Sequence, residues 1–389
     1  MSIHIRTLPN ELRDASTRVR DYGMPNSFSR ILIAIALPAL CSANLAFADH
    51  EHMSNELEVF LAAEAYHGSG HVRAADDESW VSADVVFGLT QHQFRVFGEL
   101  YITPSERDLE RLQFGFEIVP ETVLWIGRFH QPASAWNTEH HHGHYLQTAI
   151  TRPFIERWED EHGLIPQHIT GALLESRRPI GQDGAIQISG GAGAGSSLTH
   201  DAMTPIDLIG NNPGKHHLSL TGRIAYLPEY VGTSSFGVLY GHDQISTGSP
   251  LLLSALNSRH AVLSIYGVYG DWNNEPWRII GANYYVDVAL DPTTRNESFI
   301  SGYLQFERQI PHDLTVFGRV EDSARMQESN YVALFDDRNG DIDIALRRQA
   351  LGLRWDYVRR QALTIELSHV VSLRQRADEV RIQWSAVVP

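Results

Sequence analysis

One stretch of the sequence, WNTEHHHGHYLQTAITRPFIERWEDEHG from Trp136 to Gly163, gathers two kinds of side chain that could do chemistry. Its histidines could bind a metal ion, and they are His140, His141, His142, His144 and His162. Its carboxylates could attract cations, and they are Glu139, Glu156, Glu159, Asp160 and Glu161. Because imidazole suits Zn, Cu and Ni, a zinc or copper site in this stretch is one hypothesis. The other is a solvated acidic loop whose histidines titrate near neutral pH.

The spacing of these residues does not match a known metal motif. The sequence has no H-E-x-x-H pattern and no Cys/His finger spacing. Three adjacent histidines, 140 to 142, cannot all point at one ion from an extended segment. We therefore expect no cofactor, and we keep zinc or copper binding as an alternative for this stretch.

Nucleophilic catalysis has little support in the sequence. There is no G-x-S-x-G nucleophile elbow. His369 lies on the apolar phase of an alternating segment, where a lipid hydrolase built on a β-barrel could place a catalytic histidine. We expect a protein that is not an enzyme, with an outer-membrane lipid hydrolase as an alternative.

The first 48 of the 389 residues differ from the rest. Arg30 precedes an apolar run over 31–48 that ends in the small-x-small pattern Ala46-Phe47-Ala48. This pattern predicts a secretory signal peptide over 1–48 and a mature domain over 49–389, with Met24 as an alternative start that gives a signal of ordinary length. Cleavage would remove Cys41, the single cysteine. The net charge of −16 argues against nucleic acid as a partner.

Alternation with a period of two recurs along the mature chain. In LTIELSH, Leu363, Ile365 and Leu367 fall on one face, opposite polar residues. Sixteen such segments are expected, near residues 55–66, 80–90, 93–103, 109–119, 122–130, 167–178, 184–194, 216–227, 234–245, 260–270, 277–288, 297–309, 312–322, 346–357, 360–370 and 377–387. The connections between them alternate between short and long, which is expected of a transmembrane β-barrel with turns on one side and loops on the other. The sequence therefore predicts an all-β, antiparallel, up-and-down barrel of about sixteen strands.

These features together resemble Gram-negative outer-membrane porins. Residues 122–132, TVLWIGRFHQP, are similar to the strand that leads into the third external loop of phosphate-selective-type porins. The resemblance implies an outer-membrane location in a Gram-negative bacterium, contact with membrane lipid, and passive diffusion of small hydrophilic solutes or cations. It also implies a homotrimer, and a long third loop, residues 131–166 here, that folds into the lumen and sets the constriction.

Charge on that loop predicts its selectivity. Residues 131–166 carry the five acids named above against Arg152 and Arg157, a balance of −3 with neutral histidines, so we expect cations to be favoured. The lumen phase of the strands is expected to carry arginines facing these acids, namely Arg223, Arg319, Arg354 and Arg381. Passage or capture of divalent Zn or Cu through the same barrel is the remaining alternative.

Overall fold

The chain separates into two units, Met1–Ser42 and Ala43–Pro389. The computed structural model describes parts of the second unit: residues 53–69, 78–104, 107–133, 136–140, 144–159, 162–199, 202–210, 214–230, 232–246, 260–291, 296–335 and 344–388. The expected signal peptide, residues 1–48, lies outside the described residues, so it stays a prediction.

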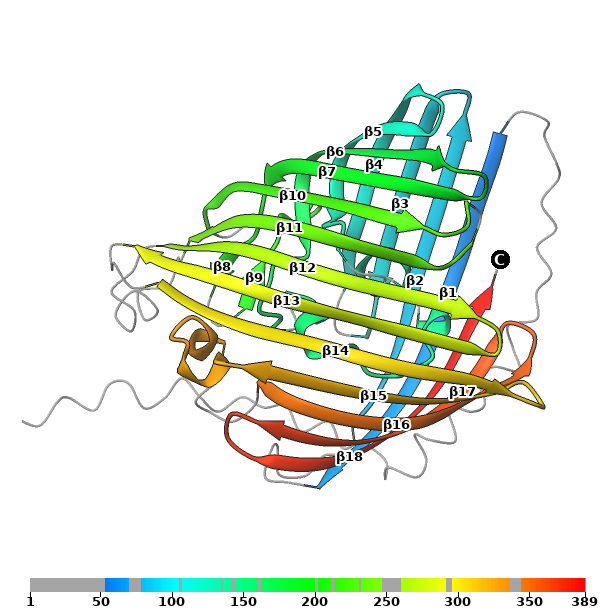
Figure 1. The fold of residues 1–389 in the computed structure, drawn as a ribbon, viewed down its shortest axis with the longest axis vertical. Helices are drawn as coiled ribbons and strands as arrows, with labels where there is room; N and C mark the ends of the chain where they lie inside the picture. The colour runs from blue at the N-terminus through cyan, green and yellow to red at the C-terminus, as the bar shows by residue number, and fades with distance from the viewer. Residues whose placement is uncertain are drawn as a thin grey trace, which may run out of the picture. The chain divides into compact units, whose positions relative to one another are not determined.

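Sixteen strands form a closed antiparallel barrel, in which β1 pairs with β18 to complete the ring (Figure 1). The barrel strands are β1 (Met53–Ser69), β2 (Glu78–Gln91), β3 (Phe94–Ile102), β4 (Arg107–Val119), β5 (Thr122–His130), β6 (His168–Ile180), β7 (Gly184–Ala194), β10 (His216–Leu227), β11 (Ser235–Ser246), β12 (His260–Asn274), β13 (Trp277–Asp291), β14 (Asn296–Ile310), β15 (Leu314–Ala324), β16 (Ala345–Val358), β17 (Gln361–Ser372) and β18 (Arg376–Val388). Each of the sixteen expected segments overlaps one of them. The predicted fold class and strand number are confirmed.

The two faces of the strands differ in the way that a membrane barrel requires. In β17, Ile365 and Leu367 are 41% and 51% exposed, whereas Thr364 and Glu366 between them are buried. A soluble sandwich would bury the apolar face. Here the apolar side chains point outward, toward lipid, because a bilayer accepts apolar surface and a closed ring leaves no strand edge unpaired.

Loops of unequal length occupy the two ends of the barrel. Tight turns such as residues 92–93, 120–121 and 359–360 join strands at one end, which we call the short-turn end. The opposite, long-loop end carries the connection between β5 and β6, residues 131–167, which we call loop 3. It contains the short helices η2 (Trp136–His140), η3 (His144–Leu146) and η4 (Phe154–Glu156). No helix among the described residues is long and apolar enough to cross a membrane.

Two other connections at the long-loop end also carry structure. A small hairpin, β8 (Ser197–Thr199) and β9 (Ala202–Thr204), lies between β7 and β10. The helices η5 (Met326–Glu328) and η6 (Val332–Leu334) lie between β15 and β16.

The barrel interior contains a hydrophobic core, which the sequence pattern did not predict. Inward side chains of β11 to β14, such as Leu263 and Val286, are buried in one cluster with loop residues such as Trp136, Phe154 and Tyr331. A membrane barrel that encloses a channel ordinarily carries polar side chains on its inner face. The difference arises because loop 3 and the other long connections bring apolar side chains inside, and these need an apolar wall to pack against.

Candidate functional site

Loop 3 spans the interior of the barrel from one wall to the other. Its two ends join β5 and β6, and its middle contacts strands that lie across the ring. The guanidinium of Arg354 on β16 donates to the carbonyl oxygens of Tyr145 (2.7 Å) and Gln147 (2.5 Å). Thr148 Oγ1 donates to Glu307 Oε2 on β14 at 2.8 Å. The loop therefore folds into the lumen, the position that the porin resemblance implied.

A carboxylate on β17 receives the centre of the loop. Glu366, which has no exposed surface, accepts hydrogen bonds from the backbone nitrogens of Ile150 (2.8 Å) and Thr151 (3.2 Å) and from the Thr151 hydroxyl. Arg319 on β15 donates to the Thr151 carbonyl oxygen at 2.6 Å. Glu321, two residues along β15, accepts from the backbone nitrogen of Phe154 at 2.7 Å. Charged side chains of the wall thus bind backbone groups that would otherwise be buried without partners.

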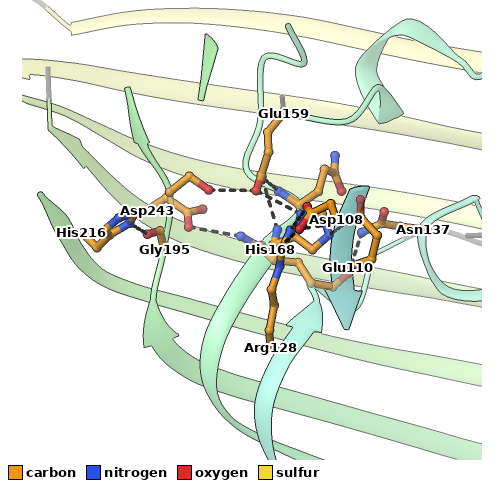
Figure 2. Close-up of polar contacts among 12 residues, drawn as sticks. Asp108, Glu110, Arg128, Asn137, Glu159, His168, Gly195, His216 and Asp243 are labelled. Carbon is orange, nitrogen blue, oxygen red and sulfur yellow. Dashed lines mark hydrogen bonds and ion pairs between the residues drawn. The ribbon is translucent and has the colours of Figure 1, made fainter. Parts of the chain in front are cut away.

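The acids of the loop that the structure describes serve the loop's own packing. Glu156 has no exposed surface and accepts a hydrogen bond of 2.5 Å from the Tyr284 hydroxyl on β13. Glu159 is also fully buried, and it accepts from Ser196 Oγ at 2.9 Å and lies 3.1 Å from His168 Nδ1 (Figure 2). Neither carboxylate faces open water. The side chains of Glu139, Asp160 and Glu161 lie outside the described residues.

The two arginines of the loop also bind within it. Arg152 donates to the Glu156 carbonyl oxygen at 2.5 Å, and its guanidinium lies 3.7 Å from the centre of the Trp158 ring. Arg157 lies 5.3 Å from the ring centre of Phe154. These contacts hold the loop's return segment in shape.

The four strand arginines expected in the lumen phase have two kinds of partner. Arg223, Arg319 and Arg354 donate to carbonyl oxygens of loop 3, those of Ala133 (3.4 Å), Thr151 and Gln147. Arg381 instead pairs with Glu64 on the neighbouring strand β1, at 2.7 Å. Three of the four arginines therefore bind the loop, and two of these, Arg319 and Arg354, also pair with strand carboxylates, those of Glu321 (2.9 Å) and Asp356 (2.7 Å).

The described histidines of the loop do not converge. The His140 ring packs 5.0 Å from the Trp136 ring, and the His144 ring packs 5.1 Å from the Trp80 ring on β2. His162 adopts a positive φ of 66° in a turn. None of the three belongs to a metal-ligating group among the residues that the structure describes. Because His141 and His142 lie outside those residues, metal binding by the His-rich stretch stays a prediction.

The buried charges of the interior are mostly on the strands, and the sequence analysis did not assign their acids. Among the described residues, twelve buried carboxylates accompany six buried guanidiniums. The carboxylates are Glu64, Asp84, Glu99, Glu110, Glu156, Glu159, Asp243, Asp271, Glu297, Glu307, Glu321 and Glu366. In the sequence, such an acid could have been recognised by its place at a polar position of an alternating segment, as Glu366 is in LTIELSH. Among the buried side chains that the structure describes, acids thus outnumber guanidiniums.

A polar cavity of about 220 Å³ lies beside the start of loop 3. Pro132 and Asn137 of the loop line it together with charged strand residues, including Arg111, Arg177 and Arg223. The cavity therefore provides a polar space next to the loop.

His369, the residue behind the hydrolase alternative, forms a pair on the outward phase of the sheet. Its Nδ1 lies 2.7 Å from Asp378 Oδ1 on β18, and the two side chains are 48% and 76% exposed. This is an exposed cross-strand contact between an imidazole and a carboxylate, and exposed pairs of this kind contribute little to stability.

Comparisons with known proteins agree with this architecture. The anion-selective porin from Comamonas acidovorans superposes with a TM-score of 0.56 at 11% identity, over 86% of this chain and 100% of the porin. The chain has the fold of a Gram-negative outer-membrane porin. The outer-membrane channel DcaP of Acinetobacter baumannii gives a TM-score of 0.53 at 11% identity, over 88% and 99% of the two chains. Salmonella typhi OmpF in complex with daunomycin gives 0.54 at 12% identity, over 86% and 97%.

Sequence comparison alone finds no relative. No protein-family model matches the chain, and a search of the curated proteins found no match. The porin fold is nevertheless clear from the closed ring, and the apolar outer face places the barrel in an outer membrane.

Proposed function

We propose that this porin-fold barrel is a narrow channel through which small hydrophilic solutes diffuse passively, with a preference for cations. The observation that carries the proposal is loop 3, which crosses the lumen and is bound to the far wall by Arg354, Arg319 and Glu366. A loop fixed in this way leaves a passage of constant width. Nothing in the proposal requires a chemical step, so we propose no enzymatic activity.

The position of the hydrophobic core supports one course for the passage. Loop 3 packs its apolar side chains against β11 to β14, which makes that side of the lumen dry. The opposite wall, formed by β1 to β4, presents polar inward residues such as Glu64, Asp84 and Gln113. We propose that solutes move between loop 3 and this polar wall, where hydrogen-bonding groups can replace their hydration water.

The cation preference rests on the charge of the interior. Buried carboxylates outnumber buried guanidiniums two to one among the described residues, and three of the six arginines bind loop carbonyl groups. A low-dielectric wall strengthens this negative field along the passage. The loop acids without described side chains, Glu139, Asp160 and Glu161, would add to it.

The test is conductance of the detergent-purified protein in a planar lipid bilayer. We expect discrete current steps and, in a gradient of potassium chloride, a reversal potential of the sign that marks cation preference. Detergent alone is the blank. Absence of conductance would remove the channel, and a reversal potential of the opposite sign would remove the cation preference. Native mass spectrometry of the same sample tests the homotrimer that the porin resemblance implies.

A further inference from the structure

Two histidines face each other where loop 3 leaves and rejoins the sheet. His130 is the last residue of β5 and His168 is the first residue of β6, and the two are direct register partners. Their ring centres are 4.6 Å apart. Opposite residues of an antiparallel pair have Cβ atoms about 4.5–5.5 Å apart, so both rings can reach one point between the strands. The loop thus closes at a pair of imidazoles.

A carboxylate from the next strand completes a group of three. Glu110 on β4 places Oε2 3.0 Å from His168 Nε2. One ligand atom from each of Glu110, His130 and His168 lies within 4.8 Å of the other two, and all three residues are buried. Ligand atoms around a tetrahedral zinc ion lie about 3.4 Å apart, given bonds of about 2.1 Å. Small side-chain rotations would bring the three atoms to that spacing.

The hydrogen-bonding pattern of His168 leaves a place for a cation. Its Nδ1 lies 3.1 Å from Glu159 Oε1 and its Nε2 lies 3.0 Å from Glu110 Oε2, so each ring nitrogen has a carboxylate beside it (Figure 2). Without metal, a proton on Nε2 satisfies this contact, and a bound cation would take the place of that proton between Nε2 and Oε2. A carboxylate that orients a ligating histidine in this way is a recurrent feature of zinc sites.

The charges around the three residues favour a divalent ion. Asp108 and Glu110 both contact Arg128, whose guanidinium is fully buried, at 3.0 Å and 3.5 Å. With Glu159, the group holds three carboxylates against one guanidinium, a balance of −2 with neutral histidines. Buried charge of one sign is destabilising unless it is compensated. A divalent cation would neutralise the group.

We propose that Glu110, His130 and His168 form a binding site for a divalent transition metal of the zinc class. Two imidazoles and one carboxylate match the ligand preference of Zn²⁺, with a fourth position for water. The cavity of about 220 Å³ is lined in part by His130 and gives the ion a route to the site. Bound metal would fasten β4, β5 and β6 together at the root of loop 3, and through Glu159 it would fix the loop's return segment.

The test begins with the full chain, purified in detergent without a histidine tag and stripped of metal by a chelator that is then removed. Zn²⁺ is titrated at pH 7.5 in competition with a chromophoric chelator. We expect one ion per chain. His130→Gln and His168→Gln should each lower the zinc affinity at least about 100-fold, and Glu159→Gln, which removes the orienting carboxylate, about 10- to 100-fold. Heat-modifiable mobility on gels verifies that each variant forms the barrel.

The matched control replaces histidines of the same loop that lie away from the three residues. The double variant His140→Gln/His144→Gln should keep the affinity of the original chain. Absence of tight zinc binding, or its loss in this control and not in His130→Gln, would overturn the assignment. Should the histidine variants fail to fold, X-ray absorption of the original chain with zinc bound still decides, because the site requires two imidazole ligands in the first coordination sphere.

The result of the zinc titration does not depend on whether the barrel conducts ions. Conductance of the stripped chain tests the passage through the barrel, whereas zinc stoichiometry tests the site. A chain that conducts ions and binds no zinc would contradict the metal site alone.

Discussion

Arg354 on β16 donates a hydrogen bond of 2.5 Å to the carbonyl oxygen of Gln147. Gln147 lies in the middle of loop 3, where the loop reaches the wall across the ring from β5 and β6. The guanidinium also donates to Asp356 Oδ1 at 2.7 Å, so its charge is paired while it binds the loop. Wall charges and loop backbone groups are therefore mutually dependent. The wall needs counter-groups for its buried ions, and the loop needs partners for backbone atoms that have left secondary structure.

Replacing Glu366 by alanine should release the centre of loop 3. The change removes the acceptor of three hydrogen bonds from Ile150 and Thr151, and each buried donor left without a partner is worth roughly 1–3 kcal/mol. We expect the segment to leave the wall, so single-channel conductance rises and proteolysis within 144–156 becomes faster. Asp322→Asn is the control, because Asp322 pairs with Arg347 at the exposed surface. Equal conductance in the two variants would argue against Glu366 as an anchor.

Asp84 offers a test of the negative interior field. It is buried on the inward phase of β2, on the proposed passage wall. At about 8 Å and a water-like dielectric, one charge stabilises a passing cation and destabilises a passing anion by about 0.5 kcal/mol each, so Asp84→Asn should lower the cation-to-anion permeability ratio about fivefold. The measurement is the reversal potential in a salt gradient at low ionic strength, where screening is weakest. An unchanged or larger ratio would place the passage elsewhere.

The strands of the barrel were predictable because their signal is local. Alternation within a segment such as 360–370 depends only on neighbouring residues, and a closed barrel turns each alternating segment into one strand. Short and long connections could be sorted by parity for the same reason. The sequence pattern was enough to reach the observed ring.

The burial and the hydrogen-bond partners of the charged loop residues were not predictable, because those partners are remote in sequence. Glu156 meets Tyr284 and Glu159 meets Ser196, contacts that exist only once the ring has closed and the loop has entered it. A count of charges along 131–166 treats such acids as solvated. The pairing of His130 with His168 was different, since strands expected to end near 130 and begin near 167 would bring these residues together at the root of the loop.

Replacing Tyr331 by phenylalanine should loosen the hydrophobic core inside the barrel. The Tyr331 hydroxyl is fully buried and donates to the Leu164 carbonyl oxygen of loop 3 at 2.8 Å. Its loss leaves that carbonyl without this donor, so the free energy of unfolding should fall by roughly 1–3 kcal/mol. The apparent melting temperature in detergent measures this. Tyr357→Phe is the control, because the Tyr357 hydroxyl bonds Gln361 in an exposed setting and should have a small effect.

The stability difference between the original chain and Tyr331→Phe should depend on pH, and the sign of this dependence is definite. Burial raises the pKa of Tyr331 well above its ordinary value of about 10. A folded-state pKa above the unfolded one means that the stabilisation is complete below about pH 10 and is lost as pH rises toward the folded value. The difference in melting temperature between the original chain and Tyr331→Phe should therefore be constant from pH 7 to 9 and shrink above about pH 10. A difference that grows at alkaline pH would contradict the buried, neutral phenol.

His369 and Asp378 distinguish a channel from a lipid hydrolase on the outer face of the barrel. Their side chains are 2.7 Å apart and exposed, the arrangement of an ordinary surface ion pair, which typically stabilises by about 0–1 kcal/mol. We expect His369→Ala to leave both conductance and melting temperature nearly unchanged. We also expect the original chain to release no fatty acid from phospholipid in mixed micelles, with or without Ca²⁺. Release that His369→Ala abolishes, while the variant still forms the barrel, would show that the outer face carries an active site and that passive diffusion is not the whole function.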